Sequence, residues 1–563
     1  MNAKFKSILS GIIAVSAAVI LSIGCSSPSV GPLPVPTLPE GETINLSSSD
    51  VDAAKIVNSM KFGWNLGNTL DANDAGENWS NQKAGTEIDW SLKDTATPAL
   101  FKKLKASGIK TVRIPISWHN HVDAEMNINS AWMNHVQEVV NMAYNEGLFV
   151  IINIHHDNYE GTDLGTKAGF TLLDQDKAQS LKFVEKIWTQ IANTFKDYDG
   201  HLVFETLNEP RVVGGNHEWG CDGTPQWACS TCKQRFAIIN DLNQKAVDTI
   251  RASGGNNAKR VIMFPAYVAA PYAAINAYKE NIFKIPTDTA TNRLALSVHM
   301  YTPYNFAMEY PGSSTLTSTH KSDLASHFTA LYSTFISKGI PVVIGEMGAT
   351  NKDNFEARKE WFTYYLGLCK TYNVAAVLWD NGKETNSDPK EAFGFMNRTA
   401  SGGPAWFTDS KAAELIAAAV EARGTSDNGG SSSGNSKTIW TGTQDLKHWD
   451  GAYGITLNAS SFSTATASTK IRLTISIGAE CTATDNEGNP CSNNYSTIHP
   501  ITGWTNGNIN FSEANTDKQL SVSPTASAST VTISPDSTSW ATIKSKGLII
   551  YGHKVVITKI ELM

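Results

Sequence analysis

The sequence predicts an α/β chain in which a (β/α)8 barrel is followed by a small all-β sandwich. Between residues 43 and 423, short apolar runs alternate with helical patterns, which is typical of repeated βα units around a parallel sheet. From residue 437 to 563 the chain is rich in Thr, Ser, Val and Ile and contains period-two runs at 470–477 and 555–562. A chain of 563 residues also exceeds what one hydrophobic core usually supports, so two domains are expected.

Eight short apolar runs are the expected barrel strands. They span residues 62–66, 111–116, 149–154, 202–207, 261–265, 294–299, 341–345 and 375–379. The stretches between them are amphipathic, and one example places apolar groups on a single helical face at Leu181, Val184, Ile187, Trp188, Ile191 and Phe195. Eight such units predict a closed barrel.

The first 25 residues have the pattern of an export signal. Lys4 and Lys6 precede an apolar stretch, 8–23, that is too short for a typical membrane span. Gly24-Cys25 resembles the lipobox of bacterial lipoproteins, which implies a lipid anchor at Cys25. Ordinary secretion is the alternative, because Leu21 sits one place further from the cysteine than the usual leucine. Either way we expect an exported bacterial protein.

Two segments have linker composition. Residues 26–42 are Pro-rich and favour extended conformations, whereas residues 424–436 are rich in Gly, Ser and Asn and cannot bury a core. The formal net charge of −7 is mild for this length and predicts no nucleic-acid partner. Neutral partners fit this charge better. Fifteen Trp is a high count: we expect most of them in the core and a minority along a sugar groove, because indole faces stack against pyranose rings. We expect a monomer that needs no cofactor.

Three cysteines, Cys221, Cys229 and Cys232, crowd one loop. A zinc site needs about four ligands and would have to recruit His217 or a remote group. In an exported protein one disulfide with a spare thiol is the favoured interpretation.

Two further thiols, Cys481 and Cys491, flank the turn-rich segment DNEGNP, so a local disulfide is predicted there. Cys369 lies in a helical pattern and is expected to be buried.

Two glutamates follow predicted strands in a way that suggests chemistry. The run HLVFETLNEP ends in Asn208-Glu209-Pro210, and Pro210, which lacks an N–H, cannot continue a strand ladder. The run PVVIG delivers Glu346 in the same manner. Two carboxylates aimed from strand ends into one cleft suit acid/base and nucleophilic chemistry, and cleavage of a sugar polymer is the leading hypothesis.

Other predicted strand ends also carry polar or aromatic groups, which should share the same barrel face. These candidate substrate-binding residues are Asn65, Arg113, His155, His156, Asn208, His299, Tyr301 and Trp379. Adjacent residues of a strand point to opposite faces, so His155 and His156 are not expected to chelate one ion, and no metal site is predicted.

Seven motifs occur in an order that resembles glycoside hydrolase family 5, in particular its subfamily 4 endoglucanases. They are GWNLGNTLDA, VRIPISW, INIHHD, FETLNEP, SVHMYTPYNF, VIGEMGA and VLWDNG, within residues 50–423. The resemblance implies a retaining β-glycanase with Glu209 as acid/base and Glu346 as nucleophile. It also places Arg113, His155, Asn208, His299, Tyr301 and Trp379 at active-site positions. The cysteine-bearing loop looks like an insertion of this chain's own.

A retaining mechanism requires two carboxyl groups with opposite protonation states. We expect Glu346 to be ionised, because Arg113 and the Tyr301 hydroxyl stabilise its charge, and Glu209 to be protonated, because a second anion lies nearby. Asn208 is expected to hydrogen-bond the sugar 2-hydroxyl, with Trp379 beneath the reacting sugar.

The C-terminal domain lacks a recognisable catalytic pair of acids and is expected to bind polysaccharide, with a mere spacer as the alternative. Its tail, TSWATIKSKGLIIYGHKVVITKIEL, resembles the last strands of carbohydrate-binding modules of the β-sandwich type. Trp440 and Trp540 are expected in the core, which leaves Trp449, Trp504 and Tyr551 as exposed platforms.

The complete prediction is an exported endo-β-1,4-glucanase that acts on cellulose, mixed-linkage glucan or xyloglucan. The alternatives are a related β-mannanase or xylanase, a surface lipoprotein that captures glycans without cleaving them, and a metal-dependent barrel hydrolase.

Overall fold

The computed structural model describes most of the two predicted domains. The described residues are 32–38, 41–72, 92, 95–159, 164–165, 167–221, 228–385, 389–424, 437–447, 454–463, 465–466, 469–478, 496–505, 507–522, 524 and 529–563. Within these ranges, no helix combines the length and the apolar character needed to cross a membrane. Four residues named above lie outside the described residues: Cys25, Trp449, Cys481 and Cys491. The lipid anchor, the exposed platform and the disulfide predicted at these positions lie outside them too.

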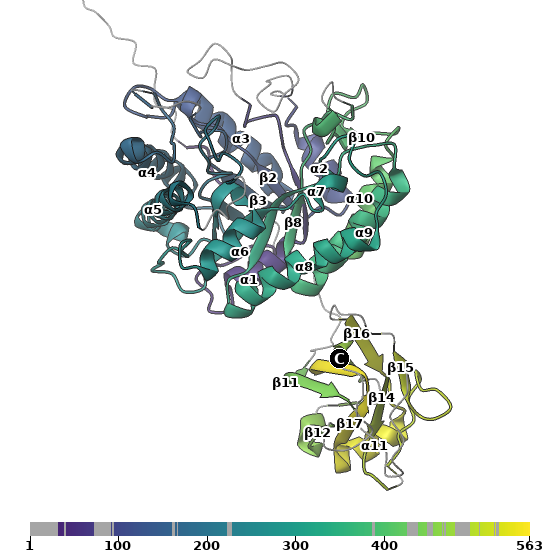
Figure 1. The fold of residues 1–563 in the computed structure, drawn as a ribbon. Helices are drawn as coiled ribbons and strands as arrows, with labels where there is room; N and C mark the ends of the chain where they lie inside the picture. Colours follow the sequence, from purple (N-terminus) through teal and green to yellow (C-terminus); the bar gives the residue numbers. More distant parts are fainter. Residues whose placement is uncertain are drawn as a thin grey trace, which may run out of the picture.

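Eight parallel strands close into a barrel in chain order, with β8 paired to β1, and the predicted (β/α)8 architecture is confirmed (Figure 1). The strands are β1 (Phe62–Asn65), β2 (Thr111–Ile114), β3 (Phe149–Asn153), β4 (Leu202–Glu205), β5 (Ile262–Pro265), β6 (Leu294–His299), β7 (Val342–Met347) and β8 (Ala375–Leu378).

The carboxyl ends of β5 and β6 agree with the prediction, and those of the other six strands differ from it by one or two residues. Two of these differences matter for the site. β4 ends at Glu205, so Glu209 lies in the loop four residues beyond it. β7 continues to Met347, so Glu346 lies within the strand. The β6–β7 register shifts between Val298 and His299, which places His299 directly opposite Glu346. This bulge aims two site residues at each other.

The helices that surround the barrel bury apolar stripes against the outer faces of the strands, as the amphipathic pattern predicts. In α4 the buried stripe includes Val184, Ile187, Trp188, Ile191 and Phe195, with Leu181 half-buried at its edge. The helices are α2 (Pro98–Ala106), α3 (Ser130–Asn145), α4 (Lys177–Phe195), α5 (Ser230–Ala252), α6 (Pro271–Lys279), α7 (Tyr304–Ala307), α8 (Ser318–Thr334), α9 (Phe355–Tyr372) and α10 (Ala412–Arg423), with a small hairpin of β9 (Met396–Asn397) and β10 (Ala405–Trp406) before α10.

The barrel interior consists of two chemically different layers. The lower layer is apolar and packs against α1 (Ala53–Met60); it includes Ile151, Val203, Met263, Val343 and Val377. Side chains on a strand alternate between faces, so the next inward position lies two residues further on. On β3 and β4 these positions are Asn153 and Glu205, both fully buried. The apolar layer therefore supports a polar layer at the carboxyl ends of the strands.

Part of the predicted 26–42 linker packs on the barrel. The backbone N–H of Leu33 donates to the side chain of Gln137 in α3 at 2.7 Å, and the Gln137 amide donates back to the Leu33 carbonyl at 2.8 Å. Leu38 is buried in the barrel's main hydrophobic cluster. The apolar residues among the prolines give this segment a surface to bury, so residues 32–38 are not a free spacer.

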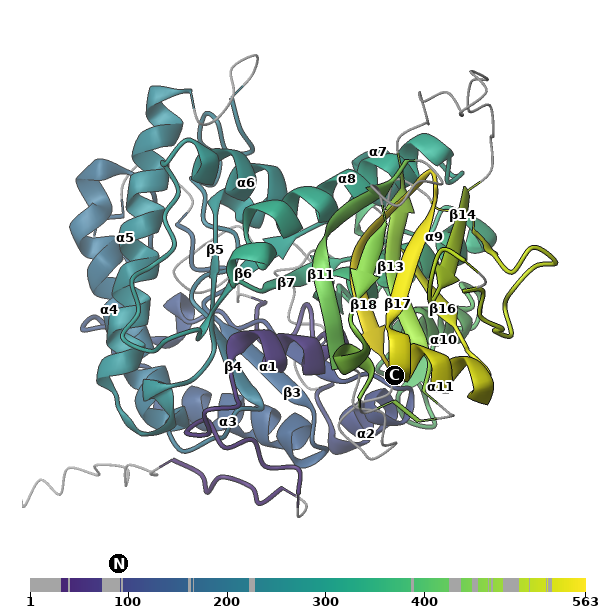
Figure 2. The same cartoon turned by 90° about the horizontal axis from the view of Figure 1, so that it is seen from below.

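The C-terminal domain contains two four-stranded sheets, β11-β18-β13-β16 and β12-β17-β14-β15, and the predicted sandwich is confirmed (Figure 2). Its strands are β11 (Lys437–Leu446), β12 (Ile455–Leu457), β13 (Ile471–Ile477), β14 (Ser496–Ile501), β15 (Leu520–Val522), β16 (Ser529–Ile533), β17 (Leu548–His553) and β18 (Val555–Leu562). Along β13 buried and half-buried residues alternate, which is the period-two signal read from the sequence.

One part of this domain differs from the all-β expectation. Residues 537–546 form helix α11 (Ser537–Lys546) rather than a strand. The Asp536 carboxylate accepts from the N–H of Ser539 and caps the helix, and Trp540 and Ile543 turn one face into the core. The helical spacing of these two apolar residues was the signal that the strand interpretation missed.

Candidate active site

Glu346 lies in β7 and receives two hydrogen bonds that favour its charged form. Arg113 in β2 donates from Nη1 to one carboxylate oxygen at 2.9 Å, and the Tyr301 hydroxyl donates to the other at 2.9 Å. His299 Nδ1 lies 3.5 Å from the same oxygen as Tyr301. The Glu346 side chain is only 8% exposed, so these contacts replace most of its water.

Glu209 lies opposite, on the loop after β4. One of its oxygens is 2.7 Å from His299 Nδ1, and the other is 3.3 Å from Arg211 Nη1. The Glu209 side chain is 19% exposed and is therefore the more accessible carboxylate of the two. His299 lies between the two carboxylates.

The two carboxylates are close. One oxygen of Glu209, one oxygen of Glu346 and a ring nitrogen of His299 all lie within 4.8 Å of one another. Retaining glycosidases place their two carboxyl groups about 5–5.5 Å apart, whereas inverting enzymes leave about 6.5–9.5 Å for a water molecule. The separation in this chain is on the short side, which suits direct attack by one carboxylate on a sugar carbon.

Arg113 links this pair to the barrel wall. Its guanidinium is fully buried and donates to Glu205 at 2.8 Å, to the Asn65 side chain at 3.0 Å and to the Asn208 side chain at 2.7 Å, in addition to Glu346. Burial alone would lower the pKa of Arg113, but the carboxylates of Glu205 and Glu346 outweigh it and raise that pKa. Arg113 is therefore a permanent cation in the site.

The sequence interpretation missed Glu205. This fully buried carboxylate accepts from Arg113, from the Asn153 amide at 2.9 Å and from the Ser297 hydroxyl at 2.6 Å. The available signal was an ionisable residue at an inward position of an otherwise apolar strand. Buried carboxylates require such partners, so Asn153 and Ser297 belong to the same network.

The protonation order of the carboxylates differs from the one predicted. Burial tends to raise the pKa of Glu209, but the hydrogen bond and charge of His299 outweigh it and lower that pKa. Burial, together with the charge of Glu209, raises the pKa of Glu346 despite the lowering effects of His299 and Arg113. Burial would lower the pKa of His299, yet Glu346 and Glu209 raise it. The sequence argument omitted the imidazole, which lies 2.7 Å from Glu209 and lowers its pKa.

The other candidate residues surround the pair. The Asn65 amide donates to the Gly345 carbonyl at 2.9 Å, and His155 stacks on Trp379 with ring centroids 6.1 Å apart. Burial, followed by the charges of His156 and Arg113, lowers the pKa of His155 well below its usual range. His155 is therefore a neutral, buried imidazole beside Trp379.

His155 and His156 do not diverge as predicted. β3 ends at Asn153, so strand alternation no longer applies, and the two rings meet edge to face with centroids 4.4 Å apart. Ligand atoms of both histidines and of Asp71 lie within 4.8 Å of one another. Burial raises the pKa of Asp71 to about 6 although His156 and three backbone N–H groups oppose it.

The predicted disulfide in the cysteine loop is wrong. Cys221, Cys229 and Cys232 are all free thiols, and they gather around the ring of His217. Cys369 is buried, as predicted.

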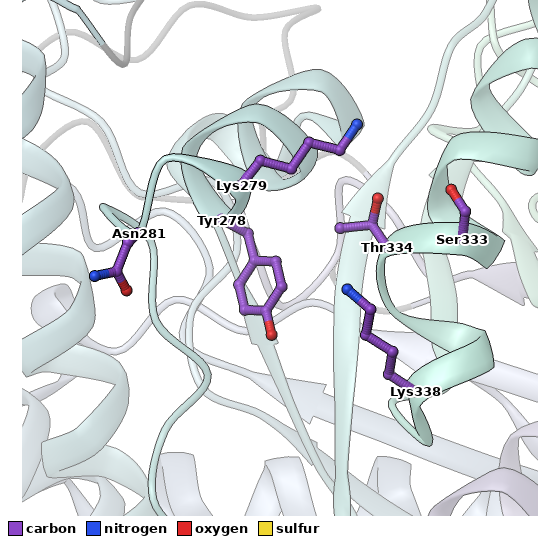
Figure 3. A pocket seen from close by; sticks show the side chains of 6 residues that line it. All are labelled: Tyr278, Lys279, Asn281, Ser333, Thr334 and Lys338. Carbon is purple, nitrogen blue, oxygen red and sulfur yellow. The ribbon is translucent and has the colours of Figure 1, made fainter.

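A hollow of about 460 Å³ lies elsewhere on the barrel (Figure 3). It is lined by Tyr278, Lys279, Asn281, Ser333, Thr334 and Lys338. These residues lie at or just after the ends of helices that lead into β6 and β7, which puts them beside the amino ends of the strands. Barrel active sites lie at the opposite, carboxyl-terminal face, and no carboxylate lines this hollow, so it is not the candidate site.

The polar layer predicts a large stability cost for Glu205→Gln. This change leaves the buried Arg113 with one carboxylate instead of two, and breaking a buried ion pair costs about 3–5 kcal/mol. In α9, Glu360→Gln removes an exposed contact with Lys321 and should change stability by no more than about 0.5 kcal/mol. Urea denaturation of the barrel measures both. Equal losses would contradict the role assigned to Glu205.

The pKa shifts predict a pH-dependent effect of His299→Asn. The pKa of His299 is raised above 6.5, so its stabilising effect is complete below that pH and is lost as pH rises through the folded-state pKa. The pKa of Glu209 is lowered below 4.5, so its effect is complete above that pH and is lost on acidification. The decrease in denaturation temperature that His299→Asn causes relative to the wild type should therefore be greatest between pH 4.5 and 6.5. A flat profile for His299→Asn would contradict the coupling of His299 to Glu209.

Comparison with known proteins agrees with this geometry. The family model for cellulase (glycosyl hydrolase family 5) matches residues 70–385. Endoglucanase B of Clostridium cellulovorans is 36% identical over 361 residues, which cover 62% of this chain and 72% of that protein.

Two solved structures share the barrel. A GH5-4 broad specificity endoglucanase from Ruminococcus champanellensis, with bound cellotriose, is 37% identical with a TM-score of 0.57, covering 66% of this chain and 99% of its own. A family 5 lichenase from Caldicellulosiruptor sp. F32, solved as a mutant bound to cellotetraose, is 34% identical with a TM-score of 0.57. The match covers 70% of this chain and 98% of the lichenase chain. With a family match over more than half of its length and a barrel mouth that holds two facing carboxylates, this chain belongs to glycosyl hydrolase family 5.

Proposed function

We propose that this family 5 endo-β-1,4-glucanase cleaves its substrate by double displacement, with Glu346 as nucleophile and Glu209 as acid/base. The observation that carries the assignment is the approach of the two carboxylates to within 4.8 Å across the barrel mouth. The assignment of the roles rests on their partners. Glu346 has the permanent cation Arg113 and the Tyr301 hydroxyl, whereas Glu209 has a titratable partner, His299.

In the first step Glu346 attacks the anomeric carbon and Glu209 protonates the leaving oxygen. The proton comes from the Glu209–His299 pair, whose 2.7 Å contact allows it to reside on either partner. A bound sugar displaces water from Glu209 and shifts the proton toward the carboxylate. Once Glu346 is esterified, its negative charge is gone, and Glu209 acts as base toward the water that releases the sugar.

The remaining candidate residues suit sugar contacts. The Asn208 side-chain oxygen accepts from Arg113, which leaves its NH2 group to donate to the sugar 2-hydroxyl. Trp379 and the neutral His155 form a stacked pair that offers apolar ring surface to a pyranose. The cello-oligosaccharides bound by the two similar structures favour linear β-glucan chains. Cellulose, mixed-linkage glucan and xyloglucan are the proposed substrates.

Azide rescue on an activated aryl cellobioside tests the two roles. Glu209→Ala should slow turnover by about 10²–10⁴-fold, because no base activates water, and azide should restore turnover with a β-glycosyl azide as product. Glu346→Gly should show no turnover, and azide entering from the nucleophile's side should yield the α-glycosyl azide. Glu360→Ala on the outer helix α9 is the control and should retain wild-type rates. If azide restores neither variant, the roles are wrong.

Export of the enzyme is proposed from the N-terminal residues. The basic start, the apolar stretch 8–23 and Gly24-Cys25 fit a signal segment, and lipidation at Cys25 would attach the enzyme to the cell surface. A polymer too large to enter a cell requires an enzyme outside it, which agrees with this placement.

The sandwich domain is proposed to bind β-glucan through the exposed Trp504 and the half-buried Tyr551 beside it. Trp504 is 56% exposed and its ring centroid lies 5.0 Å from that of Tyr551, whose hydroxyl is 2.8 Å from His499 Nδ1. Trp540 is buried and Trp440 packs on the core, so neither is a platform. Exposed aromatic faces beside polar groups suit a sugar ring.

A depletion assay on insoluble cellulose tests this domain in the full-length chain. Trp504→Ala should weaken binding by about tenfold, or about 1.4 kcal/mol, while hydrolysis of a small soluble substrate stays unchanged. Tyr332→Ala removes an aromatic that is 46% exposed on helix α8 and should bind like the wild type. Unchanged binding of Trp504→Ala would favour the spacer alternative.

A further inference from the structure

Four metal-ligating side chains meet in the loop between β4 and α5. Nδ1 of His217 lies 3.0 Å from Sγ of Cys221, 3.5 Å from that of Cys229 and 3.7 Å from that of Cys232. The sulfurs of Cys221 and Cys232 are 3.5 Å apart. All four ligand atoms lie within 4.8 Å of one another. Nothing in the proposed cleavage mechanism uses these groups.

These separations match the edges of a tetrahedron around a zinc ion. Zinc binds sulfur at about 2.3 Å and histidine nitrogen at about 2.0–2.1 Å, which gives edges of about 3.8 Å between sulfurs and about 3.5 Å between nitrogen and sulfur. A disulfide would require sulfurs about 2.05 Å apart, use only two of the three thiols and leave the histidine without a role. The spacing His-x3-Cys and Cys-x2-Cys within the loop is also typical of structural zinc sites.

The protein holds the ligands in place from outside the cluster. His217 adopts a left-handed backbone with φ of 63°, which a histidine rarely adopts, and its carbonyl is fixed by hydrogen bonds from Arg235 at 3.0 Å and Tyr267 at 2.8 Å. Arg235 is itself buried and also donates to the Asn216 carbonyl at 2.7 Å. Cys232 is buried in the first turn of α5. Such support orients the ligands of a metal site.

We propose that His217, Cys221, Cys229 and Cys232 bind one zinc ion in a closed structural site. The three thiols lose their protons on binding, which leaves a complex of net charge −1 beside the Arg235 guanidinium. Because the protein fills all four positions, no position remains for water or substrate, so the ion stabilises structure and does not take part in hydrolysis.

The site would fix a segment that reaches the proposed acid/base. Residues 217–221 carry two ligands at their ends and Glu218 and Trp219 between them. Glu218 pairs with Arg211 at 3.1 Å, and Arg211 in turn contacts the Glu209 carboxylate and lies over the Trp219 ring, 4.7 Å from its centroid. Trp219 is 61% exposed on this loop. The zinc ion would therefore hold Arg211 beside Glu209 indirectly, by fixing the position of Glu218 and Trp219.

Elemental analysis of the untagged, full-length protein, purified without chelator, tests the site. We expect about one zinc per chain. Replacement by cobalt(II) should give the intense visible ligand-field bands of a tetrahedral thiolate site, and removal of the metal should lower the denaturation temperature of the barrel. None of these three readouts depends on hydrolysis, so the site can be tested whether or not the roles of Glu209 and Glu346 hold.

Variants locate the ion. Cys221→Ser and Cys229→Ser, at half-buried positions, should each lower zinc from about one to near zero per chain and abolish the cobalt bands. Cys369→Ala removes a thiol in α9 and should retain both signals. Zinc that persists in both loop variants would place the ion elsewhere, for example at Asp71, His155 and His156, and would overturn the proposal. The proposal would also be overturned if the wild-type protein contained no zinc and its intact mass showed a disulfide among the three cysteines.

Discussion

The active face of this barrel depends on one buried cation. Arg113 projects from β2 into the barrel and compensates two carboxylates, Glu205 in β4 and Glu346 in β7, while it also holds Asn65 and Asn208. Both carboxylates lie in the barrel interior with Arg113 as a cationic partner, and transfer of an unpaired ion out of water costs several kcal/mol. Without Glu205, Arg113 would keep only one carboxylate partner, Glu346. The guanidinium therefore joins four strands in a single electrostatic unit.

This unit explains why the two facing glutamates differ. The nearest charged partner of Glu346 is Arg113, at 2.9 Å, which does not titrate, and His299 is further away at 3.5 Å. The nearest charged partner of Glu209 is His299, at 2.7 Å, which does titrate, and Arg211 is further away at 3.3 Å. A fixed cation suits a group that must carry negative charge, and a titratable imidazole suits a group that must give and take a proton. The β-bulge that sets His299 opposite Glu346 brings the imidazole within reach of both.

The loop after β4 connects the site to its surroundings. The same loop carries Glu209, Arg211 and the four ligands of the proposed zinc site, and the Glu218–Arg211 pair links its two halves. A barrel can vary such loops without changing its strands, because the strands alone carry the polar layer. A zinc ion bound by the cysteines would add rigidity to the loop that carries Glu209, while Arg113 organises the polar layer beneath it.

The sequence by itself determined the eight barrel strands, the sandwich and the residues that gather at the barrel mouth, because apolar periodicity and strand-end polarity are local signals. It could not reveal Glu205 as a partner of Arg113, His299 between the glutamates, or the approach of His217 to three thiols. These pairs are separated by as many as 92 residues, and only closure of the barrel and its loops brings them into contact. Tertiary structure also decided the directions in which the pKa values of Glu209, His299 and Glu346 shift, because a pKa depends on burial and on neighbouring charges that no local pattern contains.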